Sequence, residues 1–354
     1  MKPMLDLYSD YLLASFSQVS ATGLSTLMDG AISHDQVTRF LSQEKKTSKD
    51  LWLLVKPFVK QMSANGVLII DDSIEEKPST DENDIIAWHY DHATDRNVKG
   101  INFVSTLYQN NATALPIGFA LVAKTEVYFD KKSNKMKRRS PITKNEMARA
   151  MIQQAVINEV AFSYVLFDAW FSSVENINFI KRDCHKEVIC PIKTNRKVAL
   201  SVADKQAGHW QAVSTLAMKA NTTQEIYLEG VAFPLLLVQQ IFTNEDGSES
   251  SLYLIASDTT LDYERITTIY QRRWNVECYH KSLKQNVSLE KSPTRTETTQ
   301  TNHFFAALCG YIKLEMLKVK SKTNHFALKT KLYVTALQAA FQTLREMNPV
   351  HLSA

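Results

Sequence analysis

The stretch Gly66-Val-Leu-Ile-Ile-Asp-Asp-Ser73 decides the fold class of this chain. Its apolar run is short and rich in β-branched side chains, which predicts a strand that is buried on both faces. A second run of this kind, Tyr164-Val-Leu-Phe167, also ends in an aspartate, Asp168. Because helical patterns alternate with these strands, the sequence predicts an α/β core built on a mixed sheet with flanking helices.

The segments between and after these strands predict the rest of the core. Asn110-Asn111 lies between two strand-like runs, so Ile101–Tyr108 and Leu115–Ala123 are expected to form a hairpin. Apolar residues at helical spacing predict a helix over Asn145–Asn158. The remaining expected elements are a helix over about Ser173–Cys184 and a strand over Glu187–Ile192.

Changes of pattern divide the chain into five segments. The first is helical and is a predicted DNA-binding region, and a later β-rich stretch shows no helical period. After that stretch the pattern is helical to the end of the chain. The predicted order is therefore the N-terminal helical region (1–65), the first part of the core (66–193), the β-rich insertion (194–258), the second part of the core (259–320) and a C-terminal helical segment (321–354).

Length and composition are those of a folded protein of about two domains. The 354 residues include 44% hydrophobic and 22% charged side chains. The longest apolar runs are too short to span a bilayer, and the N-terminus lacks the apolar core of a signal peptide. We therefore expect a cytoplasmic protein without a membrane partner. The cysteines show no CxxC spacing, which argues against zinc or disulfide frameworks and predicts buried, reduced thiols.

The charge balance is mildly basic, with a net charge of +4. One basic cluster is Lys131-Lys-Ser-Asn-Lys-Met-Lys-Arg-Arg139. The other lies between Glu277 and Lys331, where basic residues outnumber acidic ones. Each cluster fits either a solvated surface or a groove that follows the phosphates of a nucleic acid.

Residues 17–41 predict two short helices joined by a glycine turn. Ser17–Met28 is followed by Asp29-Gly30, and Ser33 is placed to cap a second helix that ends at Leu41. This arrangement is compatible with a helix-turn-helix DNA reader and, equally, with a plain helical packing unit.

One continuous helix is predicted for the stretch Tyr270-Gln-Arg-Arg-Trp-Asn-Val-Glu-Cys-Tyr-His-Lys-Ser-Leu-Lys284. It has no Gly or Pro, and its apolar residues do not alternate with polar ones. At about 100° per residue, four of its side chains fall within about 60° of arc. They are Tyr270, Arg273, Glu277 and Lys284. Taken alone, this stripe is most simply a solvated, salt-bridged face.

Three carboxylates occupy positions at which a metal site is expected. Asp72 and Asp168 each follow a buried strand, and Glu277 lies on the later helix. Two divalent cations need acidic oxygen ligands from several elements, and buried carboxylates without a cation or a partner are costly. A single aspartate at a strand end more often serves a turn or caps a helix, so the prediction rests on the three together.

The pattern Tyr270-x2-Arg273-x3-Glu277-x6-Lys284, with Trp274, resembles the signature of the insertion sequence 4 group of DDE transposases. Ile69-Ile-Asp-Asp-Ser73 resembles that family's first motif, with Ser where Thr is common. Val165-Leu-Phe-Asp-Ala-Trp-Phe171 resembles the second. The motifs occur in the family's order, and a β-rich insertion precedes the glutamate. The resemblance covers roughly residues 65 to 320 and implies a ribonuclease H-like catalytic domain.

The resemblance also implies roles for these residues. Asp72, Asp168 and Glu277 are the expected catalytic residues and ligands of two Mg²⁺ ions, for which Mn²⁺ can substitute. Asp71 is the fallback for Asp72, because alternation along a strand points one of the pair inward and the other outward. The implied DNA-binding residues are Tyr270, Arg273 and Lys284 on backbone phosphates, and Trp274 on an unpaired base or, alternatively, in the packing of its helix.

The function implied is that of a transposase. It would bind the terminal inverted repeats of an insertion sequence, cleave the DNA ends through a hairpin intermediate and join the 3′-hydroxyl ends to target DNA. Its partners would be double-stranded DNA, as ends and as target, and a second copy of the chain in a synaptic dimer. The alternatives are a ribonuclease H-like nuclease or resolvase that cuts without joining, and a catalytically inert DNA-binding repressor.

Motifs of other enzyme classes are missing from the sequence. His89-Tyr-Asp-His92 is not part of an HExxH motif, and the nine glycines form neither a Walker loop nor GxGxxG. Ser172 and Ser173 lack the glycines of a nucleophile elbow. These observations argue against a zinc protease, a nucleotide-binding enzyme and a serine hydrolase.

Overall fold

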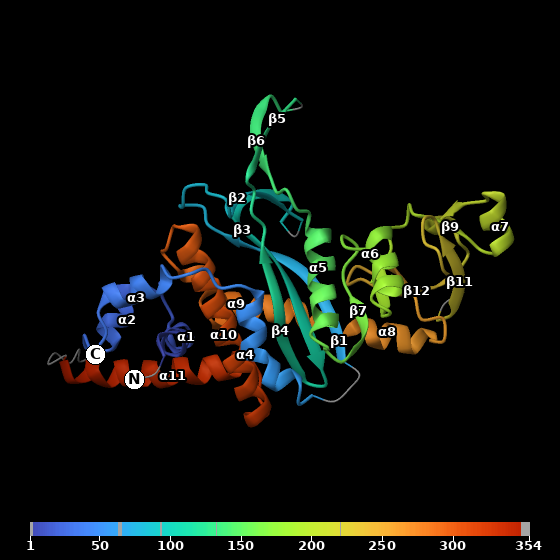
Figure 1. Ribbon diagram of the computed structural model, residues 1–354. Helices are drawn as coiled ribbons and strands as arrows, with labels where there is room; N and C mark the ends of the chain where they lie inside the picture. The colour runs from blue at the N-terminus through green and yellow to red at the C-terminus, as the bar shows by residue number, and fades with distance from the viewer. Residues whose placement is uncertain (1–2, 63–65, 93, 132, 220, 348–354) are drawn as a thin grey trace. The chain divides into compact units, whose positions relative to one another are not determined.

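The computed structural model describes residues 3–62, 66–92, 94–131, 133–219 and 221–347 (Figure 1). The chain divides into two compact units, each built from segments that are separate in the sequence. The first unit comprises Met1–Thr47, Glu75–Gly100 and Cys278–Ala354, and the second comprises Ser48–Ile74 and Ile101–Glu277.

The second unit is built around a mixed sheet whose central strand is β1 (Gly66–Glu76). On one side β1 pairs in parallel with β7 (Phe162–Leu166), which pairs in parallel with β8 (Glu187–Pro191). On the other side lies β3 (Arg96–Asn110), which pairs antiparallel with β4 (Thr113–Leu121). The order β4-β3-β1-β7-β8 is ribonuclease H-like, and it confirms the predicted fold class.

The apolar run of β1 forms the centre of the core, because Val67, Leu68, Ile69 and Ile70 are all fully buried. Helices α4 (Ser48–Val59) and α5 (Lys144–Ile157) both pack against β4. Thr143 caps α5 through a capping box with Glu146. The segment after β7 forms α6 (Val174–Asn178) and a π-helical turn, Phe179–Asp183.

The β-rich insertion continues the central sheet. Its strands are β9 (Lys197–Ala199), β10 (Gln211–Ala212), β11 (Thr223–Leu228), β12 (Leu235–Thr243) and β13 (Glu249–Ala256). β13 pairs antiparallel with β8, and this pairing joins the insertion to the core. The insertion also contains a helix that the sequence did not indicate, α7 (Val202–Ala207). Six residues are too few to show a helical period.

The predicted continuous helix over residues 270–284 is wrong, because the structure breaks it into α8 (Tyr263–Gln271) and α9 (Trp274–Asn286). Arg272 lies at the break, and its Nη2 donates to the backbone oxygen of Gln109 at 2.8 Å. The side-chain amide of Asn275 donates to the carbonyl of Arg272, also at 2.8 Å. The Asn275 contact gives the carbonyl of Arg272 a partner other than a helical N–H group.

A separate two-stranded hairpin follows β4 in the second unit. Its strands are β5 (Glu126–Asp130) and β6 (Lys135–Arg139). It extends away from the end of β4 (Figure 1).

The described part of the first unit is mainly helical and also contains the end of β1, β2 (Ile86–Asp91) and the beginning of β3. Its central element is α10 (Glu297–Ser321), whose residues 300 to 312 are all buried. The other elements are α1 (Met4–Ala14), α2 (Ala21–Leu27), α3 (His34–Leu41), the end of α9, the 3₁₀ turn Leu289–Lys291 and α11 (His325–Met347). Among the described helices, no segment is long and apolar enough to cross a membrane.

Two local predictions can be compared with the structure of the first unit. Ser33 caps α3, and its capping box with Gln36 confirms the predicted helix start. The use of α2 and α3 as a DNA reader stays a prediction. The four cysteines are free, and the prediction that all are buried is wrong for Cys278, which is exposed on α9.

Candidate active site

The candidate site lies in the second unit, where β1 continues beyond its pairing with the end of β7. Asp71 and Asp72 follow the apolar run of β1, and Asp168 lies two residues after the last residue of β7. Because β1 and β7 run parallel and their pairing ends at Ile69 and Leu166, the residues that follow this pairing on the two strands lie near one another. Helix α9 contributes Glu277 to the same unit.

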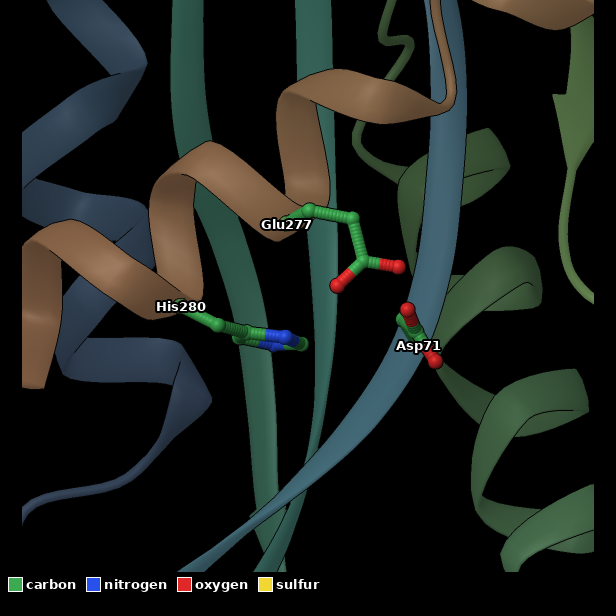
Figure 2. Close-up of side chains that lie close together, drawn as sticks. All are labelled: Asp71, Glu277 and His280. Atoms are coloured by element: carbon green, nitrogen blue, oxygen red, sulfur yellow. The ribbon is translucent and has the colours of Figure 1, made fainter. Parts of the chain in front are cut away.

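Asp71 and Glu277 form the acidic centre of this site. Ligand oxygens of the two carboxylates lie within 4.8 Å of one another. Figure 2 shows the two side chains pointing toward each other from β1 and α9, with His280 one turn further along the same helix. Arg273 bridges them, with Nη1 3.3 Å from Asp71 Oδ2 and Nη2 3.1 Å from Glu277 Oε1.

The electrostatic state of Asp71 is unusual for an aspartate. Burial raises its pKa to about 8, and the negative charges of Asp168 and Glu277 act in the same direction. The guanidinium of Arg273 opposes this increase but does not cancel it. Asp71 is therefore a carboxyl group whose ionisation costs free energy unless further positive charge is supplied.

Asp168 is held by the loop that follows it. Its Oδ1 accepts hydrogen bonds from the backbone N–H groups of Trp170, at 3.0 Å, and Phe171, at 3.3 Å. Burial raises the pKa of Asp168, and these two hydrogen bonds oppose the increase. Phe171 is fully buried, so the loop is anchored in the core.

Asp72 has a different environment from Asp71. Both of its carboxylate oxygens lie 2.8 Å from the amino group of Lys144, and Oδ2 also accepts a hydrogen bond from Asn102 at 2.9 Å. The Lys144 amino group lies 4.1 Å from the centre of the Trp170 ring. Successive side chains of a strand point to opposite faces, which explains why the two aspartates differ.

The other predicted DNA-binding residues, Tyr270, Trp274 and Lys284, lie in different environments. Tyr270 is half-buried in the second unit, and burial raises its pKa. Trp274 is 67% exposed, so it does not pack its helix against the core. Lys284 belongs to the first unit, where its amino group lies 3.4 Å from Glu290.

Lys144, Asn102 and Trp170 were not identified from the sequence. Lys144 is the first residue of α5, and the capping-box pattern Thr143-Lys-Asn-Glu146 could have placed it at a helix start. Nothing in the local sequence pairs it with Asp72, because that contact joins residues far apart in the chain.

The donor set fits a divalent cation. Asp71, Asp168 and Glu277 offer hard oxygen ligands, and Asp71 and Asp168 are each at a raised pKa through burial. A divalent cation would offset the mutual repulsion that Arg273 offsets only in part.

Comparison with known families defines the class of protein. Residues 1–213 match the family described as DDE superfamily endonuclease. Residues 138–312 match the family described as transposase DDE domain. The first match covers more than half of the chain, and the chain belongs to this family. It is a nuclease-type transposase with DNA as its substrate and divalent metal ions as its cofactors.

Other comparisons add little to this assignment. Among solved structures, endonuclease V from Bacillus subtilis aligns with 63% of this chain and 81% of its own, at 10% identity and a TM-score of 0.24. A TM-score this low does not establish a common fold. A comparison of the sequence with curated proteins finds no match.

Proposed function

We propose that the protein is a transposase of the insertion sequence 4 group that works as a dimer on the ends of its own element. It binds the terminal inverted repeats, cleaves the DNA there through a hairpin intermediate and transfers the 3′-hydroxyl ends to target DNA. The observation that carries this proposal is the acidic centre of Asp71 and Glu277, bridged by Arg273, with Asp168 close enough for its charge to raise the pKa of Asp71, in a chain of the DDE superfamily.

We assign the first metal ligand to Asp71, although the sequence motif favours Asp72. Asp71 lies within 4.8 Å of Glu277, whereas both oxygens of Asp72 are engaged by Lys144. Asp71, Asp168 and Glu277 would then hold two Mg²⁺ ions, for which Mn²⁺ can substitute. Such a pair of ions activates the attacking water or 3′-hydroxyl and stabilises the leaving oxygen in phosphodiester transfer.

The chain's own side chains have supporting roles in this proposal. Arg273 holds the carboxylates of Asp71 and Glu277 in place, and its free donor capacity faces a DNA phosphate. Tyr270 and Lys284 contact further phosphates. Trp274 is well exposed and stacks on an unpaired base, for which base-flipping enzymes use aromatic side chains.

Cleavage and joining of a DNA end carrying the inverted repeat that flanks the gene, in the presence of Mg²⁺, tests the proposal. The full chain should produce both a cut end and a joined product, and Asp168→Ala and Glu277→Ala should produce neither. Cutting without a joined product would instead indicate a nuclease or resolvase. Binding without cutting would indicate a repressor. Undiminished cleavage by Glu277→Ala would refute its assignment as a metal ligand.

Arg273→Ala should reduce cleavage by about a hundredfold, because two carboxylates lose the cation that positions them. It should also weaken binding to the DNA end and make the salt dependence shallower by about one unit of slope, the change expected for one lost phosphate contact. Affinities measured by fluorescence anisotropy over a salt series give this slope. Arg265→Ala, which removes an exposed guanidinium from α8, is the matched control. If the slope of the salt dependence is unchanged in Arg273→Ala, Arg273 does not contact a phosphate and only positions the two carboxylates.

A further inference from the structure

The β5–β6 hairpin presents an apolar face that is open to solvent. The two strands pair in register from Glu126 opposite Arg139 to Asp130 opposite Lys135. Alternation therefore puts Val127, Phe129 and the opposed Met136 on one face. Their exposed fractions are 58%, 53% and 63%. An isolated two-stranded hairpin is only marginally stable in water, so an apolar ribbon of this kind is expected to meet a partner.

The same hairpin is strongly basic. Residues 126–139 carry six basic side chains, Lys131, Lys132, Lys135, Lys137, Arg138 and Arg139, against Glu126 and Asp130, which is a net charge of +4. Lys137 forms an ion pair with Asp130, and Arg139 pairs with Glu126 at 2.8 Å. Arg139 also lies 5.6 Å from the centre of the Tyr128 ring. These contacts stiffen the ribbon, and the register places Lys135, Lys137 and Arg139 on the face opposite Phe129 and Met136.

We propose that this hairpin inserts into the minor groove of the DNA substrate, with Phe129 and Met136 as wedges between base pairs. Proteins that bend DNA insert apolar side chains such as Phe and Met between base steps and place basic residues on the flanking phosphates. A net charge of +4 complements the phosphates but opposes contact with the same hairpin of a second copy of the chain. The inference rests on the proposed function only in taking duplex DNA as the substrate.

Bending of a short duplex tests the proposal directly. The duplex carries a donor and an acceptor dye at its two ends, and the full chain carries Asp168→Ala so that the DNA stays intact. Binding should increase energy transfer, because a wedge kinks the duplex. The double variant Phe129→Ser/Met136→Ser should bind about tenfold more weakly, as expected for lost stacking, and should abolish the increase. Its salt dependence should stay the same, because no phosphate contact is removed.

Two further double variants distinguish the role of the basic residues of the hairpin from that of its apolar residues. Lys131→Gln/Lys135→Gln should retain the bend at saturation but make the salt dependence shallower by about two units of slope. The matched control is Ile241→Ser/Phe242→Ser on β12, where two apolar side chains have similar exposed fractions of 47% and 48%. This control should bind and bend the duplex as the parent chain does. Circular dichroism checks that each variant is folded.

Unchanged binding and bending by Phe129→Ser/Met136→Ser would overturn the proposal. If that variant also turned a dimer into a monomer in sedimentation, the hairpin would be a contact between copies of the chain. Failure of the proposed function looks different: the unsubstituted chain would neither cut nor join DNA ends. If the unsubstituted chain cuts and joins DNA ends but the hairpin variants bend the duplex normally, only the proposal about the hairpin is refuted.

Discussion

Asp71→Asn should reduce metal-dependent DNA cleavage by about a thousandfold, whereas Asp72→Asn should reduce it by only about tenfold. The two aspartates are neighbours in the sequence but differ in what surrounds them. Asp71 lies within ligand distance of Glu277, so its loss removes an oxygen donor from the acidic centre. Asp72 binds Lys144, so its loss releases that lysine from its place beside Trp170.

Single-turnover cleavage of a labelled DNA end at saturating Mg²⁺ measures this difference. Asn keeps the size of the aspartate side chain, so each variant changes mainly the charge. Lys144→Ala serves as the control for Asp72→Asn, because it breaks the same ion pair from the other side. The two should lose similar amounts of activity. An inactive Asp72→Asn beside an active Asp71→Asn would show that the motif-based choice of Asp72 is the right one.

Asp71→Asn should also stabilise the metal-free protein, by about 2–4 kcal/mol above pH 8. The pKa of Asp71 is raised from 3.8 to about 8 in the folded chain, so between these values the folded state holds a proton that the unfolded state has released. The parent chain therefore loses stability as the pH rises through this window, and the loss is complete above pH 8. The variant has no carboxyl group at this position and escapes the loss.

Urea unfolding in the presence of a chelator, from pH 5 to pH 9, gives the required free energies. The difference between variant and parent should be small at the acid end and grow steadily toward the alkaline end. Asp72→Asn is the control, and it should show no gain, because it removes a carboxylate that is paired with Lys144. Added Mg²⁺ should stabilise the parent more than Asp71→Asn. A difference that does not vary with pH would refute the raised pKa of Asp71.

The core of the fold could be predicted because its signals are local. The run Val67–Ile70 is apolar on both faces, which fits a central strand, and the structure buries it completely. The hairpin of β3 and β4 was also expected, and Asn111 at its turn has a φ of 50°, a conformation that Asn tolerates. Burial and turn chemistry act over a few residues, and they can be recognised without the rest of the chain.

The features that sequence reasoning missed depend on distant contacts. Residues 270–284 contain no Gly or Pro, yet the helix breaks where Arg272 reaches Gln109. Alternation indicated that Asp71 and Asp72 point to opposite faces, but not which face carries the acidic centre. That choice is made by Arg273 and Lys144, which come from other elements. Local propensity contains no information about such partners.

The outer end of the β12–β13 hairpin offers a place to attach a reporter. Its turn, Asn244–Ser248, is exposed, and Gly247 adopts a φ of 80° there. β11 pairs only with the Leu235–Val238 part of β12. The rest of β12, up to Thr243, pairs with β13 and with no other described strand. A fluorophore or a small domain inserted at this turn would lengthen a free ribbon and leave the pairing of β13 with β8 intact. Movement of the protein on DNA could then be followed without altering the strands that support Asp168.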